Sequence, residues 1–436
     1  MSDAPPSPLQ AGLTAAALSV ACLVLFAGLG FLLPAPRSPG ELDVGLRESA
    51  AFYARQPRFL RPLPEARTPP GLRDLRAETC GECHREIYDE WRASTHAHAW
   101  LEDAQFQEEL KKTTKDPGKD TSWICVNCHT PLVNQLPRLV AGLDGGRLDQ
   151  PLYVQNPLHD PVLQREAVTC AACHVKDGVV LGPYGDTDAP HPVRKAPGLL
   201  SPELCTQCHQ AHEELDQIAL ACVFDTGLEY AKGPAPGRGE TCQTCHMPQL
   251  QRPLSAGRAP RRTGRHWFGG SLIPKHPSFA AGLAPALAVY PDGVELSWVD
   301  PPAQARPGEE LTLRFRALNA NAGHRVPTGD PERFLLLRAE VLDDAGQALA
   351  TREVRVGAVY EWEPKLKKVS DDRLAPGEQR DFELKLRVPS QGPLRLRLIG
   401  EKHRIDQKNF DYHELQGRYV AGRRYSEQER ALPVSQ

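Results

Sequence analysis

Ten cysteines of this 436-residue chain fall into five copies of one pattern, Cys-x-x-Cys-His. The cysteine pairs are Cys80 and Cys83, Cys125 and Cys128, Cys170 and Cys173, Cys205 and Cys208, and Cys242 and Cys245. The histidines that follow them are His84, His129, His174, His209 and His246. Two thiols at this spacing lie on one side of a helical turn, where each can bond a porphyrin vinyl group, and the next histidine can bind the iron. This pattern is the attachment signature of c-type haem, so the sequence predicts five covalently bound haem c groups.

Zinc is the main alternative, because paired Cys-x-x-Cys units also build zinc sites. Zinc does not require a histidine after every second cysteine, and five units do not divide evenly into paired sites. The repeated pattern therefore favours haem.

Methionine is the other common axial ligand of c-type haems, and the chain contains only Met1 and Met247. Met247 directly follows the predicted proximal ligand His246, so it cannot reach the opposite side of the same haem. His/Met ligation, which raises the reduction potential, is therefore nearly excluded. We expect irons that carry two histidines or an open position, and low reduction potentials.

Of the 15 histidines, five are predicted proximal ligands, which leaves ten as candidates for the distal side. Five irons with two histidines each need only five of these ten, so the number of histidines does not require any iron to keep an open position. The predicted distal ligands are His96, His98, His191, His266 and His324. His96 and His98 lie two apart after the first motif, so they face different directions and could serve different haems, or one could be a bystander.

The motifs lie within residues 76–285, which we predict to be a pentahaem domain built mainly from helices and loops. The best helical pattern begins near Cys80 and places Ile87 and Trp91 on one face. Only 6% of the residues are aromatic, so much of the buried apolar volume is expected to come from the haems.

After about residue 286 the pattern changes to the period-two alternation of β-strands. It is clearest over residues 310–318, 381–388 and 393–399, and Pro-Gly-Glu turns stand at 307–309 and 376–378. Several strands with such turns and no long helix predict an all-β immunoglobulin-like sandwich over residues 286–436.

The N-terminal part predicts attachment to a membrane. After a short tail (1–10), residues 11–33 form an unbroken apolar run, and a membrane-spanning helix needs about 20 such residues. A cleaved signal peptide is the alternative, disfavoured because the tail lacks Lys and Arg and no clean small-x-small site follows. A lipoprotein anchor at Cys22 is disfavoured because the apolar run continues past it. We expect an uncleaved transmembrane anchor in the inner membrane.

Residues 34–75 are rich in Pro and Arg and predict an extended linker. By analogy with other c-type cytochromes, the bulk of the chain should face the periplasm or another extracytoplasmic side. The 52 Lys and Arg nearly balance the 55 Asp and Glu, so no basic surplus suggests nucleic acid as a partner.

Three segments resemble a known family. The pattern Cys80-x-x-Cys83-His84-x3-Tyr88-x2-Trp91-x2-Ser94-x-His96-Ala97 resembles the first haem segment of the cytochrome c554-like multihaem family. Residues 242–248 (Cys-Gln-Thr-Cys-His-Met-Pro) resemble a closing motif of that family, and Gly-His-x-x-Pro-Thr-Gly at 323–329 resembles a stretch in β-domains attached to such cytochromes. The likeness to the cytochromes covers about residues 76–285.

The resemblance implies closely packed haem pairs, mostly bis-histidine ligation and multielectron transfer outside the cytoplasm. By position it favours His96, His191, His266 and His324 as distal ligands. The chain departs from the tetrahaem type of this family by its fifth motif, its apolar N-terminal segment and its predicted sandwich, which leaves the ligand pairing open.

The leading hypothesis for function is a membrane-anchored pentahaem electron carrier that acts between redox partner proteins, one of which could be a membrane quinol-linked donor. The alternative is an enzyme that reduces a small nitrogen or sulfur oxyanion at an open-coordinated haem. Pentahaem nitrite reductases typically carry a Cys-x-x-Cys-Lys motif, which this sequence lacks. In a third role, compatible with the first, the sandwich would dock the chain to a larger redox complex.

Overall fold

The computed structural model describes residues 39–435 except 186–187, 216–219, 362–366 and 391. Residues 48–436 form one compact unit, and residues 1–47 belong to a separate N-terminal unit. All the sites discussed below lie within the unit of residues 48–436.

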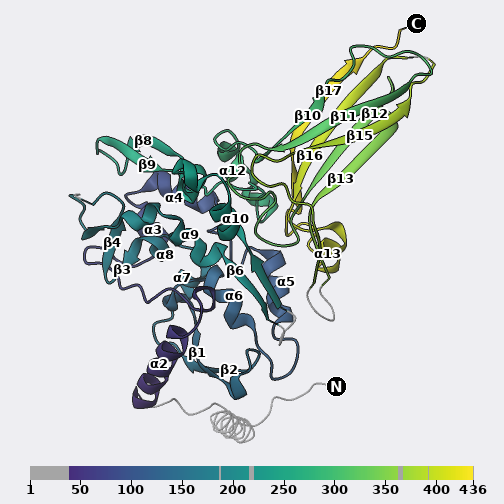
Figure 1. Cartoon of the computed structure of the whole chain (residues 1–436). Helices are drawn as coiled ribbons and strands as arrows, with labels where there is room; N and C mark the ends of the chain where they lie inside the picture. The colour runs from purple at the N-terminus through teal and green to yellow at the C-terminus, as the bar shows by residue number, and fades with distance from the viewer. Residues whose placement is uncertain (1–38, 186–187, 216–219, 362–366, 391, 436) are drawn as a thin grey trace, which may run out of the picture. The chain divides into compact units, whose positions relative to one another are not determined.

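The region that carries the motifs consists of short helices joined by loops (Figure 1). The helices are α2 (Pro39–Ala54), α3 (Ala77–Gly81), α4 (Arg85–Ala93), α5 (Ala104–Lys112), α6 (Ser122–His129), α7 (Pro161–Arg165), α8 (Cys170–His174), α9 (Pro202–His209), α10 (Thr226–Lys232), α11 (Cys242–His246) and α12 (Ala280–Leu287). Single 3-10 turns are η1 (Arg58–Leu60), η2 (Val133–Gln135), η3 (Asp144–Gly146), η4 (Pro197–Leu200), η5 (Pro236–Arg238) and η6 (Pro277–Phe279).

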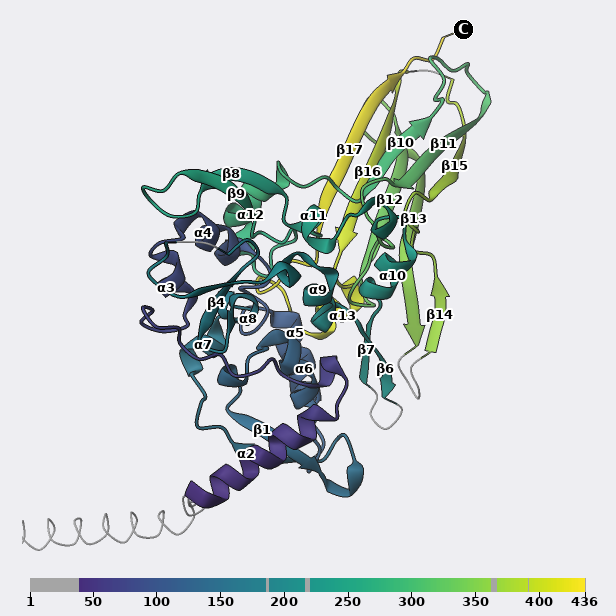
Figure 2. The ribbon, with the colours of Figure 1, turned by 60° about the vertical axis from the view of Figure 1, so that its left-hand side comes forward.

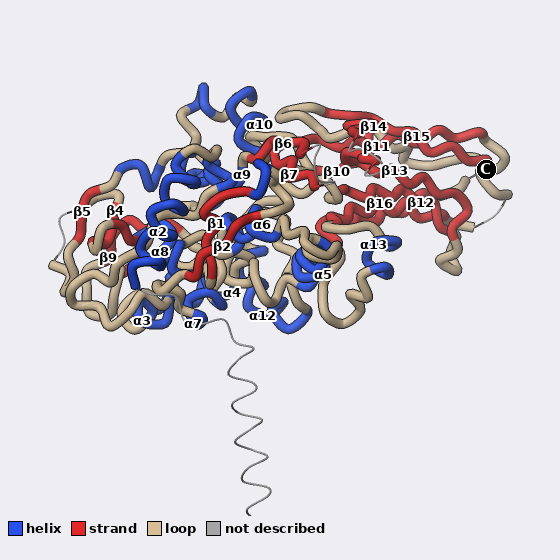
Figure 3. Tube along the Cα trace, turned by 90° about the horizontal axis from the view of Figure 1, so that it is seen from below, coloured by secondary structure: helices blue, strands red, loops and turns tan. Residues whose placement is uncertain are grey.

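Small sheets are interspersed among these helices, as the red segments of Figure 3 show. They are β1 (Arg138–Leu143) with β2 (Pro151–Gln155), β3 (Val175–Lys176) with β4 (Val179–Gly182) and β5 (Val193–Lys195), β6 (Ala211–Leu215) with β7 (Leu220–Phe224), and β8 (Gln249–Pro253) with β9 (Pro260–Gly264). The haem region is therefore mixed α/β, which corrects the prediction of a domain made mainly of helices and loops.

The predicted fold class also needs correction at the N-terminus. Within the described part of the chain, no helix has the length and apolar character that crossing a membrane requires. Residues 11–33, on which the prediction of a transmembrane helix rested, lie outside the described residues.

Residues 39–75 differ from the extended linker expected there. Residues 39–54 form α2, and Phe59, Leu60, Ala66 and Leu75 are buried. Phe59 and Leu60 pack in one apolar cluster with Trp123 of α6. The Pro and Arg content suggested an extended segment, but apolar residues spaced between the prolines bury enough surface to dock it.

The single helix expected to begin near Cys80 is broken in two. Helix α3 ends at Gly81 and α4 begins at Arg85, and His84 between them has φ −100° and ψ 51°, outside the helical region. Trp91 of α4 is buried, and its indole N–H donates to the carbonyl of Val168 at 2.9 Å. The break aims the His84 side chain independently of the helix that follows it.

The C-terminal part is an antiparallel two-sheet structure (Figure 2). One sheet has the order β10 (Val294–Val299), β11 (Glu310–Asn319), β15 (Gln379–Arg387), and the other has the order β14 (Lys367–Asp371), β13 (Ala348–Glu361), β12 (Phe334–Leu342), β16 (Leu394–His403), β17 (Gly422–Leu432). Helix α13 (Gln407–Tyr412) lies between β16 and β17 in sequence.

Alternate residues of these strands form one apolar core. Leu313 and Phe315 of β11 are fully buried with Leu337 of β12 and Leu396 of β16. The sheets are consistent with the predicted C-terminal sandwich. The alternation of apolar and polar residues along these strands could be recognised in the sequence because each sheet buries one face and exposes the other.

Candidate haem-binding site

The motif-bearing region encloses a cavity of about 2760 Å³. Small-molecule pockets usually measure about 300–1,000 Å³, so this space is far larger than one ordinary ligand needs. Its lining includes the cysteines and the histidine of all five motifs. The apolar clusters of this region are small and lie around the cavity. The residues therefore fit a set of large prosthetic groups that would occupy the interior.

Cysteines of different motifs lie against one another across the cavity. The Cys80 thiol hydrogen-bonds that of Cys170, linking the first motif to the third. The fourth motif is central, because Cys208 hydrogen-bonds Cys128 of the second motif and Cys205 hydrogen-bonds Cys242 of the fifth. Groups attached at these cysteines would be close neighbours.

Backbone carbonyls orient the predicted proximal histidines. Nδ1 of His84 faces the carbonyl of Leu254 at 2.8 Å, that of His174 faces Leu181 at 2.9 Å, and that of His129 faces Ala99 at 2.5 Å. Nδ1 of His246 likewise faces the carbonyl of Gly269. A carbonyl oxygen only accepts, so the proton sits on Nδ1 and the Nε2 lone pair is left for a metal.

Three of the proximal histidines each face a second histidine ring. The centroid separation is 6.2 Å for His209 with His96, for His174 with His266, and for His246 with His324. A metal–imidazole bond of about 2.0 Å, plus about 1.1 Å from the nitrogen to the ring centre, places two trans ligands of one metal roughly 6.2 Å apart. The three pairs therefore fit one iron between each two rings.

The distal rings are kept neutral by burial. Burial, helped by the neighbouring His209, lowers the pKa of His96 to about 3, and burial with the nearby His174 lowers the pKa of His266 to about 4. A neutral imidazole has the lone pair that a metal ligand needs at physiological pH.

The remaining predicted ligands are placed differently. His191 lines the cavity and interacts electrostatically with His84. The loop before it passes so close to Gly71 that a Cβ there would lie 2.3 Å from the carbonyl oxygen of Pro190. His98 instead stacks on Phe279 with centroids 3.7 Å apart. Its separation from His96 by two residues turns its ring away from the cavity lining.

A buried carboxylate positions His266. Glu90 of α4 accepts two hydrogen bonds from Arg252 of β8, at 2.7 and 3.0 Å, and one from Arg265 at 2.5 Å. Glu90 also accepts from the backbone N–H of His266 at 2.8 Å. Burial raises the Glu90 pKa, but the two arginines outweigh that effect and lower it. The carboxylate thus ties the β8–β9 hairpin and the start of the His266 loop to α4.

Replacing Glu90 with Gln is expected to loosen His266 and to destabilise the fold by roughly 3–5 kcal/mol, because Arg252 would lose its buried anion. Only the exposed carboxylate of Glu86, at 3.6 Å, would remain near it. Denaturant unfolding, followed by the Soret band, measures the loss. As a control, Asp89→Asn removes an exposed partner of Arg85 on the same helix and should cost about 0–1 kcal/mol. Equal effects of the two changes would contradict the positioning role of Glu90.

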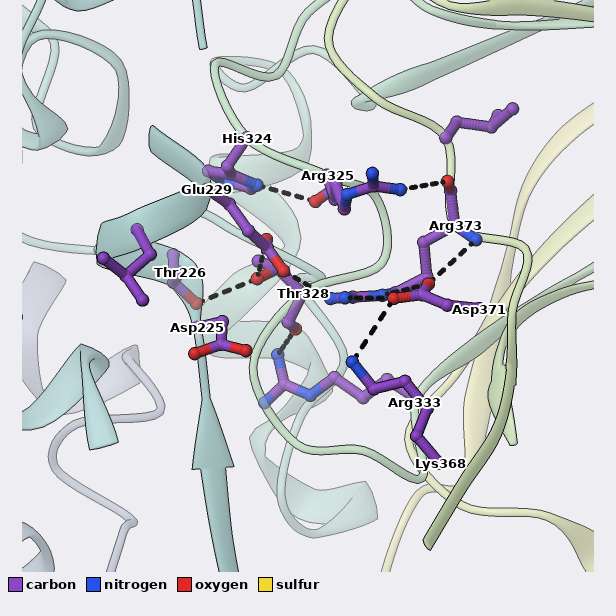
Figure 4. Close-up of polar contacts among 12 residues, drawn as sticks. Asp225, Thr226, Glu229, His324, Arg325, Thr328, Arg333, Lys368, Asp371 and Arg373 are labelled. Atoms are coloured by element: carbon purple, nitrogen blue, oxygen red, sulfur yellow. Dashed lines mark hydrogen bonds and ion pairs between the residues drawn. The ribbon is translucent and has the colours of Figure 1, made fainter. Parts of the chain in front are cut away.

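His324 comes from the C-terminal part, on the loop before β12. Its Nδ1 donates to the carbonyl of Arg325 at 2.8 Å, which leaves Nε2 free to face His246. The Arg325 guanidinium in turn donates to the carbonyl of Arg373 at 3.2 Å. Figure 4 shows this chain of contacts from the His324 ring to Arg373.

A buried ion pair fastens this loop to helix α10. Arg373 donates to Glu229 of α10 at 2.5 Å, and their side chains are 12% and 7% exposed. The hydroxyl of Thr328 donates to the other Glu229 oxygen at 2.7 Å, and Arg373 also pairs with Asp371 at 2.8 Å (Figure 4). We name these four residues the α10 latch.

Sequence reasoning missed the Glu90 cluster, the α10 latch and a group of buried charges near His129. These charges include Asp103 and Lys275, which form an ion pair and act electrostatically on His129. Their members are far apart in sequence, and each alone reads as an ordinary surface residue.

The comparisons agree with the predicted resemblance. Residues 79–142 match the model of the family described as cytochrome c554 and c-prime. No curated protein matches the chain significantly. The chain is similar to the crystal structure of a penta-haem cytochrome c552 from Thermochromatium tepidum, with 19% identity and a TM-score of 0.56 over 82% of this chain and 98% of that one. At this identity the likeness shows the fold.

Two other solved structures match about a third of the chain, with TM-scores well below 0.5. AvmM, which catalyses macrocyclization in alchivemycin A biosynthesis, has a TM-score of 0.21 and 10% identity over 34% of this chain and 90% of that one. Spo0M from Bacillus subtilis has a TM-score of 0.15 and 11% identity over 34% of this chain and 51% of that one. Neither likeness carries an argument about function.

Proposed function

We propose that this multihaem c-type cytochrome binds five haem c groups and transfers electrons between redox partner proteins on an extracytoplasmic side of the cell. The observation that carries the proposal is the set of three histidine pairs at 6.2 Å in one cavity lined by all five motifs. Bound haem c would supply a reversible one-electron couple at each motif. The chain's own residues attach, orient and insulate these groups.

The ligand set that we propose has a histidine on both sides of four irons. The pairs are His84 with His191, His96 with His209, His174 with His266, and His246 with His324. An iron held by two protein ligands has no free position for a substrate, which suits electron transfer. His/His ligation without methionine also supports low reduction potentials.

The cysteine contacts support a branched order of the attachment sites. The first motif contacts the third, and the fourth contacts the second and the fifth. Cys173 of the third motif interacts electrostatically with Cys208 of the fourth, which joins the two groups. Electron transfer falls steeply with distance, so close attachment sites favour rapid sharing of electrons. A membrane quinol-linked donor is one partner class that suits such a carrier.

A potentiometric titration of the holoprotein tests the proposal. We expect five one-electron equivalents per chain, with the His/His haems titrating well below the range of His/Met cytochromes. Pyridine haemochrome analysis on the same sample gives the haem count independently. Several haems titrating in the His/Met range, or fewer than five electrons taken up by a sample that contains five haems, would contradict the proposal.

A further inference from the structure

Two of the ten motif cysteines reach the surface. Cys83 of the first motif and Cys245 of the fifth are exposed, and the other eight are partly buried. The cysteine contacts described above place these two motifs at the ends of the series first, third, fourth, fifth. Because electron transfer falls steeply with distance, a protein partner must approach a haem whose attachment site lies near the surface.

The β8–β9 hairpin reaches the first attachment site. Its tip supplies the carbonyl of Leu254, which faces Nδ1 of His84 at 2.8 Å. Arg252 of β8 holds the hairpin to Glu90 of α4 through the buried ion pair described above. Figures 1 and 2 show the hairpin at the edge of the haem region, next to α4. Any side chain exposed at the hairpin tip is therefore close to the first haem site.

The loop between β4 and β5 flanks the same site. It carries His191, the proposed distal ligand of the first haem. Arg258 of the hairpin tip pairs with Asp188 of this loop, and the Arg261 guanidinium lies over the ring of Tyr184, 5.8 Å from its centroid. The hairpin and the loop thus meet beside the first haem site, where residues of both line the cavity.

The hairpin carries a surplus of positive charge. Residues 249–264 contain four arginines and no Asp or Glu. Arg252 is buried, but Arg258 and Arg262 are exposed and Arg261 is half-buried. Within the described chain, Asp188 is the carboxylate that pairs with this exposed group, and it is itself exposed. Such a pair adds at most about 1 kcal/mol to stability, so folding does not account for the exposed arginines.

The other exposed end of the haem series lacks this surplus. Near Cys245, Arg238 forms an ion pair with Glu240 at 2.6 Å, and Glu240 acts electrostatically on Cys245. Glu203 acts in the same way on Cys242 of this motif. The two ends therefore differ in charge and suit partners of different charge.

We propose that the β8–β9 hairpin is the docking surface for an acidic one-electron redox protein, which exchanges electrons with the haem of the first motif. Arg258 and Arg262 would face carboxylates of the partner, since opposite charges steer the encounter and fix its register. One electron passes between the partner's centre and the haem iron, so one is oxidised as the other is reduced. A membrane surface would need no redox site under the hairpin, which favours a protein. The inference rests on the proposed electron transfer and adds the place and charge of one partner.

The test follows reduction of the ferric holoprotein by an acidic plant-type [2Fe–2S] ferredoxin in its reduced form, in a stopped-flow instrument. Each cluster gives one electron to a ferric haem, which becomes ferrous. At about 10 mM salt, the double variant Arg258→Glu with Arg262→Glu should react roughly tenfold or more slowly than the unaltered protein. At about 0.5 M salt, where charges are screened, the two rates should converge. Glutamine at both positions should give an intermediate rate.

Lys385→Glu with Arg387→Glu is the matched control, because it makes the same change of charge at two exposed residues of β15. It should leave the ferredoxin rate within about twofold of the unaltered protein. Reduced methyl viologen, a small cation, supplies a second donor. Its rate should not fall in the hairpin variant, and the haem potentials should stay unchanged.

Three results would overturn the docking surface. Equal slowing in the β15 variant would assign the effect to net charge. Slowing with both donors, together with shifted haem potentials, would assign the arginines to haem propionates. An unchanged ferredoxin rate in a hairpin variant that loses binding to anionic lipid vesicles would assign them to a membrane. Haems that methyl viologen cannot reduce would instead contradict the proposed function itself.

Discussion

Replacing His324 with alanine is expected to convert one low-spin haem to high spin, about a fifth of the total haem signal. The reason is the 6.2 Å separation of the His324 and His246 rings, which fits two trans ligands of one iron. Electron paramagnetic resonance of the ferric holoprotein measures the change. Because the His324 ring is replaced by an empty space, added imidazole should restore the low-spin signal.

His98→Ala is the matched control for this experiment. His98 was also predicted as a distal ligand, but its ring stacks on Phe279. We therefore expect the spin-state spectrum of the His98→Ala variant to equal that of the unaltered protein. An unchanged spectrum in His324→Ala, or an equal change in both variants, would remove His324 as a ligand.

Replacing Arg373 with methionine is expected to destabilise the fold strongly. Methionine leaves Glu229 of the α10 latch buried without its cation, at a cost of roughly 3–5 kcal/mol in the free energy of unfolding. The latch also holds the loop that carries His324, so part of the His246 haem should become high spin. Denaturant unfolding and the spin-state spectrum of the same sample measure both effects.

Two further variants separate the latch from a general loss of charge. Arg380→Met breaks an ion pair with Glu378 in which both side chains are 33% exposed, and should cost about 0–1 kcal/mol. The double variant Glu229→Gln with Arg373→Met should be less destabilised than the sum of the two single variants, because neither charge is left alone. Strict additivity would contradict the latch.

The haem attachment residues and the sandwich strands could be read from the sequence because each follows a local rule. The Cys-x-x-Cys-His spacing is fixed by one helical turn, and Leu313 and Phe315 alternate as a half-buried strand requires. Such patterns can be recognised in the sequence without knowledge of the tertiary fold. The family resemblance at residues 80–97 has the same local character and was confirmed by the match over 79–142.

Features that depend on distant segments could not be read in this way. Distinguishing His98 from His96 required the position of Phe279, which is about 180 residues away in sequence. The strands β3, β4, β8 and β9 of the haem region lack a clear alternation because several of their residues line the cavity. Residues 59–75 carried a linker composition although several of their apolar side chains are buried.

The spin-state inventory of the ferric holoprotein tests the central claim most directly. Quantitative electron paramagnetic resonance and near-infrared magnetic circular dichroism should find at least four low-spin haems with two histidines each per chain. Fewer than four bis-histidine haems in a sample that contains five haems would contradict the ligand pairing on which the proposed electron transfer rests.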